Sequence, residues 1–491
     1  MTTNDRCGEL TARFCANRRR PAAAPGCSLA SFVAVVATAL FGGSCSTESK
    51  GPGSGSDAAA ATSTGAGETG SGEGTGSTVA PSETGDTAHT GVETDTGSEE
   101  ASATGTADES SSSDTGASES DSATGEPDSS VPEVELTSWL KVFDKDQLYA
   151  MALTADGESI VVGGVTPRQD QVDGVILRFD DEGESISQVL VPGTSAVTSI
   201  ATNTSGDLIV SARGMDDYDG QALVSARTVD GDVIWNAWQA LGENDLYLVD
   251  SIAVNAQDET WFLGLVLSGS DPTNFSHQAG KLTSDGEPVV MVHQPGFGFT
   301  IAAAPSGGAY LSVELLDSDT FESSFLIQHV SSDGDFVWEH ELQGLARGIA
   351  VVEDGLLVTE SHPYGAWSAL NKISPEGALD WRAETFEFNA LDRVALLADG
   401  ARVVCGTFGE PDDIERVRVG FFAAGGTLEA IHTFDHVVEP QTEDPIVFCS
   451  GLEVGADQRI FATGTLVERD ESDERVFTHW LRGFERAARH R

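Results

Sequence analysis

Basic residues are scarce in this chain, and that scarcity excludes one class of partner. The 491 residues include 27 Lys and Arg against 79 Asp and Glu, which gives a formal net charge of -52 at pH 7. A protein that holds nucleic acid needs cations to neutralise the phosphates. We therefore expect no nucleic acid partner. The acidic residues are distributed along the chain and are not confined to one segment. Their negative charge favours solubility and repels anionic surfaces.

No apolar run is long enough to cross a bilayer as a helix. The longest, SLASFVAVVATALF at residues 28–41, follows three consecutive arginines at 18–20. A charged start and a short apolar run are typical of a signal peptide. The run leads into LFGGSC ending at Cys45, which resembles a bacterial lipoprotein box. We predict that residues 1–45 are a lipoprotein-type signal peptide ending at an acylated Cys45, which would anchor the protein to a membrane.

The location predicted from this signal is outside the cytoplasm. Ser46 after the lipidated cysteine is compatible with passage to the outer membrane or cell surface. The alternative is an ordinary secreted or periplasmic protein that is cut near Ala39, in which Cys45 has no role.

Cysteine is also scarce in the part that should fold. Of six cysteines, only Cys405 and Cys449 lie outside the segment that ends at Cys45. Both fall in predicted strands of neighbouring repeats, so they either form a disulfide in an oxidising compartment or remain two buried thiols. A CxxC redox pair is absent.

Residues 46–132 lack the apolar residues that a core requires. They are dominated by Ser, Thr, Gly, Ala, Asp and Glu, with TGSGEGTGS and DESSSSDTG as examples. Such a composition cannot offset the entropy lost on ordering, so we predict a disordered acidic linker. As a flexible coil it would have a reach of about 50 Å. The folded domain is then predicted at residues 133–491.

The folded domain is built from a repeat of about fifty residues. Its first copy, Tyr149 to Leu190, contains four apolar runs joined by turns at Asp156-Gly157 and Glu182-Gly183. A turn that needs positive φ favours these Asp-Gly and Glu-Gly pairs. Seven first turns and six second turns recur along the chain, and a tryptophan follows the second turn in three copies, at Trp235, Trp338 and Trp381.

The seventh repeat stops after its third strand, and the N-terminus offers the missing one. Residues 138–143, SWLKVF, place Trp139 where the other repeats place theirs. A strand from the opposite terminus removes the last free sheet edge of a radial repeat. The predicted fold is all-β, a seven-bladed β-propeller of four-stranded blades closed by the N-terminal strand. A β-solenoid or a large sandwich does not fit this period.

The repeat also predicts which face binds. Both hairpin turns of a blade lie on one face, and the opposite face carries loops that differ between blades, where repeat proteins usually bind. The candidate residues on these loops are acidic or aromatic: Asp216, Asp217, Tyr218, Asp219, Asp317, Asp319, Tyr364, Asp412, Asp413, Asp470 and Asp473. Such carboxylates suit Ca²⁺. No DxDxDG loop is completed, so a solvated acidic rim is the alternative, and no cofactor is predicted.

Signatures of catalysis are missing from the folded part. It has no GxSxG elbow and no cysteine in the context of a nucleophile. No catalytic residue is therefore assigned. A distributed glycosidase or lyase site would leave no local motif.

The repeats resemble two known groups of propellers. ALTADGESIVVGG followed by DGVILRFDDEG resembles the bacterial delta-sixty propeller repeat, and DGDVIW, DGDFVW and EGALDW are similar to repeat ends of quinoprotein-like propellers, including the lipoprotein scaffold of outer-membrane protein assembly. The resemblance covers about Tyr149 to Glu485 and implies a fold more than a function. The vicinal disulfide and calcium-quinone site of the quinone-dependent dehydrogenases are not matched.

Two functions follow as hypotheses from these features. The first is an envelope-anchored lipoprotein whose non-catalytic propeller binds an unknown protein or glycan, or serves as a scaffold. The second is a secreted propeller enzyme, either a quinone-type oxidoreductase or a polysaccharide-cleaving enzyme.

Overall fold

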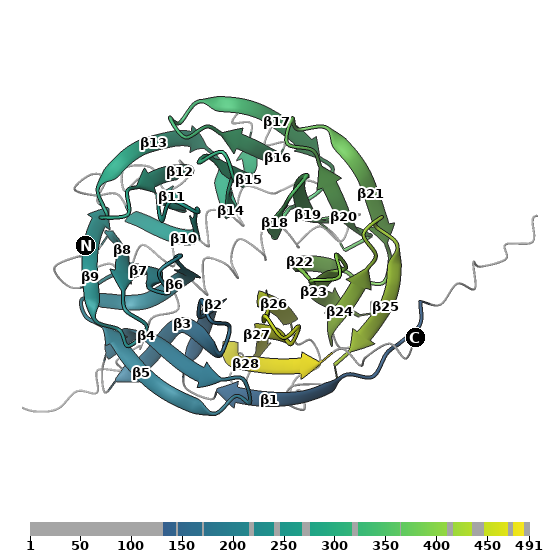
Figure 1. Ribbon diagram of the computed structural model, residues 1–491, viewed down its shortest axis with the longest axis horizontal. Coiled ribbons are helices and arrows are strands. Elements are labelled where there is room, and N and C mark those ends of the chain that lie inside the picture. Colours follow the sequence, from purple (N-terminus) through teal and green to yellow (C-terminus); the bar gives the residue numbers. More distant parts are fainter. Residues whose placement is uncertain are drawn as a thin grey trace, which may run out of the picture. The chain divides into compact units, whose positions relative to one another are not determined.

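The computed structural model describes residues 131–143, 146–168, 171–215, 220–239, 246–267, 275–316, 323–363, 365–409, 416–434, 446–469 and 475–485. The regular elements in these ranges are strands, and they form seven antiparallel sheets of four strands each. The sheets stand around a common centre, each with one edge strand innermost (Figure 1). The predicted seven-bladed propeller is confirmed. Within the described ranges, no helix is long and apolar enough to span a membrane.

The first three blades follow the chain from the innermost strand outward. Blade 1 consists of β2 (Gln147–Leu153), β3 (Ser159–Arg168), β4 (Gln171–Asp180) and β5 (Ser185–Val191). Blade 2 consists of β6 (Thr194–Thr202), β7 (Leu208–Gly214), β8 (Ala222–Arg227) and β9 (Val233–Gln239). Blade 3 consists of β10 (Leu246–Val254), β11 (Thr260–Leu267), β12 (Phe275–Leu282) and β13 (Pro288–Pro295).

The next three blades repeat this order, and the last one departs from it. Blade 4 consists of β14 (Phe297–Ala303), β15 (Ala309–Leu316), β16 (Ser323–Val330) and β17 (Phe336–Leu342). Blade 5 consists of β18 (Ile349–Val352), β19 (Gly355–Ser361), β20 (Ser368–Ile373) and β21 (Leu379–Thr385). Blade 6 consists of β22 (Ala390–Leu396), β23 (Arg402–Phe408), β24 (Arg416–Phe422) and β25 (Leu428–Thr433). Blade 7 combines β26 (Ile446–Val454), β27 (Ile460–Arg469) and β28 (Arg475–Glu485) with β1 (Thr137–Phe143).

The first turn of each blade joins the innermost strand to the second strand, as the sequence predicts. In blade 1, Gly157 has φ of 71° and its N–H donates to the Thr154 carbonyl at 2.7 Å. In blades 3 and 7 the corresponding residues are Asp258, with φ of 60°, and Gln458, with φ of 70°. A residue with a side chain is strained in this left-handed region.

The side chains of these two strained residues connect neighbouring blades. Asp258 accepts hydrogen bonds at 2.8 Å from the N–H and from the hydroxyl of Thr204, in the first turn of blade 2. Gln458 accepts a hydrogen bond at 2.6 Å from the N–H of Ala398, in the first turn of blade 6. Each bond contributes about 0.5–1.5 kcal/mol, which is comparable with the backbone strain. The face that carries the turns is thus connected by contacts between blades.

The second turns explain why glycine and tryptophan recur together. Trp139 on β1 lies over Gly183, the second-turn glycine of blade 1, and a Cβ atom at Gly183 would lie 2.6 Å from its ring. The same contact joins three more pairs, Trp235 with Gly286, Trp338 with Gly377 and Trp381 with Gly426. Valine takes the place of the indole in two others, Val189 with Gly231 and Val290 with Gly334. The outer strand of one blade therefore packs on the second turn of the next.

Three of the indoles also donate a hydrogen bond to that turn. The Nε1 atom of Trp139 donates to the Asp181 carbonyl at 2.9 Å, that of Trp235 to the Ser284 carbonyl at 2.7 Å, and that of Trp338 to the Pro375 carbonyl at 2.8 Å. A half-buried indole keeps its polar edge satisfied in this way.

The two ends of the chain close the ring. Strand β1 pairs antiparallel with β28 along its whole length, and Trp139 lies opposite Gly483. The adjacent Lys141 Nζ donates to the Gly183 carbonyl at 2.7 Å, and Arg459 forms an ion pair with Asp181. Blade 7 thus holds blade 1 through the same surfaces that join the other blades.

The residues just before β1 lie along blade 6. The Val134 N–H donates to the Ile431 carbonyl at 2.8 Å, and the Ile431 N–H donates to the Pro132 carbonyl at 3.1 Å. Val131 packs on the core between blades 5 and 6. Residues 131 and 132, just before the predicted boundary at residue 133, thus contact the propeller, and this segment covers part of the outer edge of β25.

The closing contact predicts a large effect of one indole. Trp139→Ala should lower the free energy of unfolding by about 3 kcal/mol, because it removes a partly buried ring from the only junction made by both termini. Leu140→Ala, at an exposed site on the same strand, should have little effect. Denaturant unfolding of the two variants checks this, and equal losses would show that Trp139 does not close the ring.

Candidate functional site

The predicted binding residues fall on loops outside the described part of the chain. They are Asp216, Asp217, Tyr218, Asp219, Asp317, Asp319, Tyr364, Asp412, Asp413, Asp470 and Asp473. Cys45 also lies outside it. The strands that flank these loops are described, and each second strand runs away from its first turn. The loops therefore leave the propeller on the face opposite the turns, which we call the loop face.

The innermost strands carry a recurring irregularity near the loop face. Six of the seven innermost strands contain a β-bulge in their N-terminal half, which is the half nearer the loop face. A bulge inserts one residue and redirects its side chain. In blade 5 Arg347 has the corresponding place, between the Leu345–Ser361 bridge and β18. We call these seven positions the bulge ring: Tyr149, Thr198, Asp250, Phe299, Arg347, Asp392 and Ser450.

On the side of blades 1 to 3, the bulge ring contains a buried carboxyl group. Burial raises the pKa of Asp250 to about 7, and the positive charge of Arg213 on β7 opposes that rise. Asp250 Oδ1 has no hydrogen-bond partner within the described ranges. Burial also raises the pKa of Tyr149 to about 12 against the charge of Arg213, and its hydroxyl donates to Gln147 Oε1 at 2.5 Å. These groups provide one carboxyl that titrates near neutral pH beside a fixed cation.

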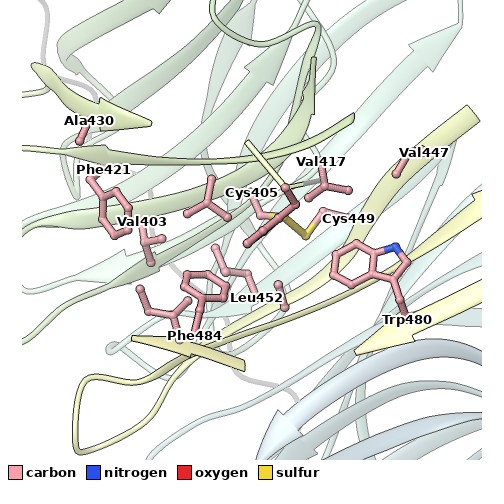
Figure 2. Packing of buried hydrophobic residues seen from close by; sticks show 14 of the residues in the cluster. Val403, Cys405, Val417, Phe421, Ala430, Val447, Cys449, Leu452, Trp480 and Phe484 are labelled. Carbon is pink, nitrogen blue, oxygen red and sulfur yellow. A yellow bond between two sulfur atoms is a disulfide. The ribbon is translucent and has the colours of Figure 1, made fainter. Parts of the chain in front are cut away.

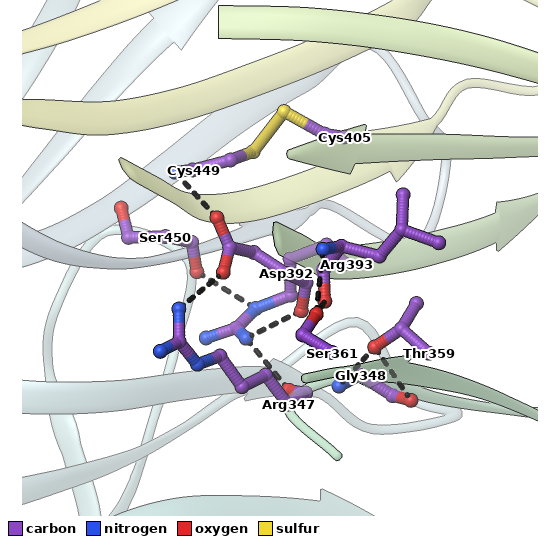
Figure 3. Close-up of polar contacts among 10 residues, drawn as sticks. Arg347, Gly348, Thr359, Ser361, Asp392, Arg393, Cys405, Cys449 and Ser450 are labelled. Carbon is purple, nitrogen blue, oxygen red and sulfur yellow. Dashed lines mark hydrogen bonds and ion pairs between the residues drawn. A yellow bond between two sulfur atoms is a disulfide. The ribbon is translucent and has the colours of Figure 1, made fainter. Parts of the chain in front are cut away.

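On the side of blades 5 to 7, the ring contains an arginine–aspartate network (Figure 3). Arg347 Nη1 donates to Asp392 Oδ1 at 2.7 Å, and the Cys449 N–H donates to Asp392 Oδ2 at 3.2 Å. Arg393 donates to the carbonyls of Arg347 at 2.7 Å, Asp392 at 2.9 Å and Ser450 at 3.0 Å. The acceptors of Arg393 are main-chain oxygens from three blades. We interpret this network as a structural connection between blades.

The disulfide lies directly beside this network. Cys405 on β23 and Cys449 on β26 are bonded, with a Cα–Cα separation of 6.1 Å, which is ordinary for a disulfide. Both are buried in the core between blades 6 and 7, close to Val403 and Trp480 (Figure 2). Of the two possibilities left open by the sequence, the structure has the bonded pair.

The bond occupies a contact that other junctions make without covalent chemistry. Between blades 1 and 2, Gly163 leaves room for Val197. Between blades 3 and 4, Gly298 leaves room for Leu263. Between blades 2 and 3 the Ser211 hydroxyl donates to the Val249 carbonyl at 3.3 Å. The disulfide therefore replaces packing at one junction, beside the blade that contains both chain ends.

Acidic side chains gather at one place within the described residues. Asp180, Asp181 and Glu182 have oxygens within 4.8 Å of one another. They belong to the second turn of blade 1, where Asp180 accepts the N–H groups of Glu182 and Glu184 and Asp181 pairs with Arg459. The carboxylates of Asp180 and Asp181 thus take part in the turn and in ring closure. Calcium at the acidic rim of the loop face stays a prediction.

Comparisons with known proteins give weak structural similarity and no matching family. No protein-family model and no curated protein matches this chain. Among solved structures, BamB from Moraxella catarrhalis is 13% identical, with a TM-score of 0.29 over 58% of this chain and 84% of that one. A functionally unknown protein from Desulfotomaculum acetoxidans is 14% identical, with a TM-score of 0.41 over 62% and 90%. The WD40 domain of SCAP from fission yeast is 8% identical, with a TM-score of 0.37 over 71% and 98%. Similarity at this level carries no argument about function.

The disulfide should stabilise the junction between blades 6 and 7. Changing both Cys405→Ser and Cys449→Ser should lower the free energy of unfolding by about 2–4 kcal/mol, because the bond restricts the unfolded chain. Chemical denaturation measures the loss. Peptide mapping without reductant should recover the linked Cys405 and Cys449 peptides from the native protein. Two separate peptides, together with unchanged stability of the double variant, would contradict the bond.

Proposed function

We propose that this protein is an envelope-anchored lipoprotein whose non-catalytic propeller binds a protein or glycan at its loop face, or holds it as a scaffold. One observation carries the proposal: the two faces use the repeat differently. On the turn face, the second-turn glycines recur at equivalent positions, and a side chain of the preceding blade packs on each of them. At the end of the innermost strands nearer the loop face, the seven positions of the bulge ring hold six different residue types.

A repeat that keeps one face constant and varies the other is suited to recognition on the varied face. The rigid blades fix where the loops begin and end, and the loop sequences determine what is bound. The acidic and aromatic residues of the loops provide hydrogen-bond acceptors and flat apolar surfaces, which suit a glycan or a basic protein segment. Calcium could bridge the carboxylates to a glycan hydroxyl.

The anchor in this proposal is the lipid on Cys45. The 87 residues from Ser46 to Pro132 would allow the propeller to lie about 50 Å from the membrane as a flexible coil. A binding module on such a tether can search a broad zone around its attachment point.

Lipidation is tested by metabolic labelling. In bacterial cells that produce the full chain and are fed an alkyne fatty acid, we expect the label on this protein. The label should be lost in Cys45→Ala and kept in Cys27→Ala, because only Cys45 follows the small residues after the apolar run. Equal labelling of Cys45→Ala, or an unlabelled native chain, would contradict the anchor.

The binding face is tested by site-specific photo-crosslinking in the same cells. A benzophenone amino acid at Asp216, on the loop face, should capture a discrete partner. The same group at Asp230, in the second turn of blade 2, should not, because that turn faces away from the loops. Equal products from both sites would contradict the assignment of faces. Turnover of a polysaccharide, or of an alcohol with added quinone and calcium, would favour the enzymatic alternative instead.

A further inference from the structure

One position on the innermost strands is alanine in six blades and glutamate in the seventh. This position is three residues after the bulge-ring residue of each blade. It pairs with a residue of the second strand. In blades 1 to 6 it is occupied by Ala152, Ala201, Ala253, Ala302, Ala350 and Ala395. In blade 7 it is Glu453, opposite Phe461. The fold is thus satisfied by a methyl group at this position, and folding alone does not account for a carboxyl there.

Glu453 lines a cavity at the turn-face end of the innermost strands. The cavity has a volume of about 570 Å³ and is bounded by blades 7, 1, 2 and 3. This size lies within the range of small-molecule sites. Most of the residues that line it have apolar side chains, and these include Leu153, Ile200, Ile252 and Val454.

The other polar side chains of the wall already have partners. The Thr202 hydroxyl donates to the Leu153 carbonyl at 2.6 Å, and the Thr154 hydroxyl donates to Asp156 Oδ1 at 2.6 Å. Glu453 has no other ionisable side chain beside it on the wall formed by β2, β6, β10 and β26. Burial alone raises its pKa to about 7. The cavity therefore offers one carboxyl among side chains that are mostly apolar.

The chemistry of that carboxyl restricts the ligand. A hard metal ion needs several oxygen ligands, and one carboxylate in an apolar wall does not supply them. An anion would be repelled by the carboxylate and by a chain of net charge -52. An organic cation satisfies both features, because its charge pairs with the carboxylate while its carbon body replaces water on the apolar wall.

We propose that this cavity binds a small organic ammonium ion, with the ammonium group on the Glu453 carboxylate and the apolar body against Leu153, Ile200 and Ile252. The cavity opens at the opposite end of the innermost strands from the bulge ring, so the proposal is independent of lipidation and of the loop-face partner.

Calorimetric titration of the full chain with phenethylammonium chloride at pH 7.5 tests the proposal. We expect saturable binding of one equivalent and at least tenfold weaker binding of 2-phenylethanol, which has a similar body without the charge. Glu453→Gln should weaken the binding of the amine at least tenfold. Glu158→Gln, at an exposed carboxyl in the first turn of blade 1, should leave it unchanged.

A second variant separates loss of binding from loss of folding. Glu453→Ala introduces the residue that the six other blades have at this position. Its midpoint temperature of thermal unfolding should therefore be at least as high as that of the native chain, while amine binding is lost. Absence of saturable binding by the native chain, equal affinity of Glu453→Gln, or equal affinity for 2-phenylethanol would each overturn the proposal.

Proton release provides an independent readout. Because a bound cation favours the charged carboxylate, binding near pH 6 should release close to one proton, and the release should fall as the pH rises through about 7. Titrations in two buffers with different heats of ionisation measure it. Glu453→Gln should show no release, and release that persists in that variant would assign the proton to another group.

Discussion

The packing of each outer strand on the second turn of the next blade is the constraint on which this structure depends. A four-stranded sheet cannot bury both of its faces by itself, so each blade gains stability only against a neighbour. The indole of Trp139 over Gly183 shows what the contact requires, an apolar side chain from one blade and no Cβ atom on the other. Positive φ favours glycine at that turn for a separate reason. Packing and backbone conformation therefore both favour glycine at this turn, which is why the repeat can be recognised in the sequence.

This convergence explains which features could be predicted from the sequence. Turns and strand alternation are local, so the seven repeats and the role of residues 138–143 follow from short patterns. The closing strand was predictable because Trp139 has the position of an outer-strand tryptophan, and the other strands of a blade do not precede it. The contacts of Asp258 and Gln458 could not be predicted, because their partners Thr204 and Ala398 lie in other blades.

Features that depend on register between blades required the structure. Cys405 and Cys449 are separated by 44 residues, and the packing of blade 6 against blade 7 brings them into one core. The bulge ring likewise needs the strand partners to be known, because a bulge is defined by two residues opposite one. Glu453 is an intermediate case. Once the innermost strands are aligned by register, the six alanines make the glutamate conspicuous, although no short motif marks it. The loop residues predicted to bind lie outside the described ranges, so their geometry adds nothing to that prediction.

The two faces of the propeller thus carry different kinds of information. The turn face repeats because it joins the blades, and near it Glu453 stands at a position where the other six blades have alanine. The end of the propeller near the loop face differs from blade to blade, and its buried charges include both a structural network around Arg393 and the carboxyl of Asp250 beside Arg213.

The course of residues 131–136 along β25 has a mechanical consequence. A pull applied to the chain ahead of Val131 would first load the contacts of this segment with the outer strand of blade 6. It would reach the β1–β28 hydrogen bonds of blade 7 only after those contacts had broken. The segment therefore shields the strand that closes the ring from force applied to the N-terminal side of the chain.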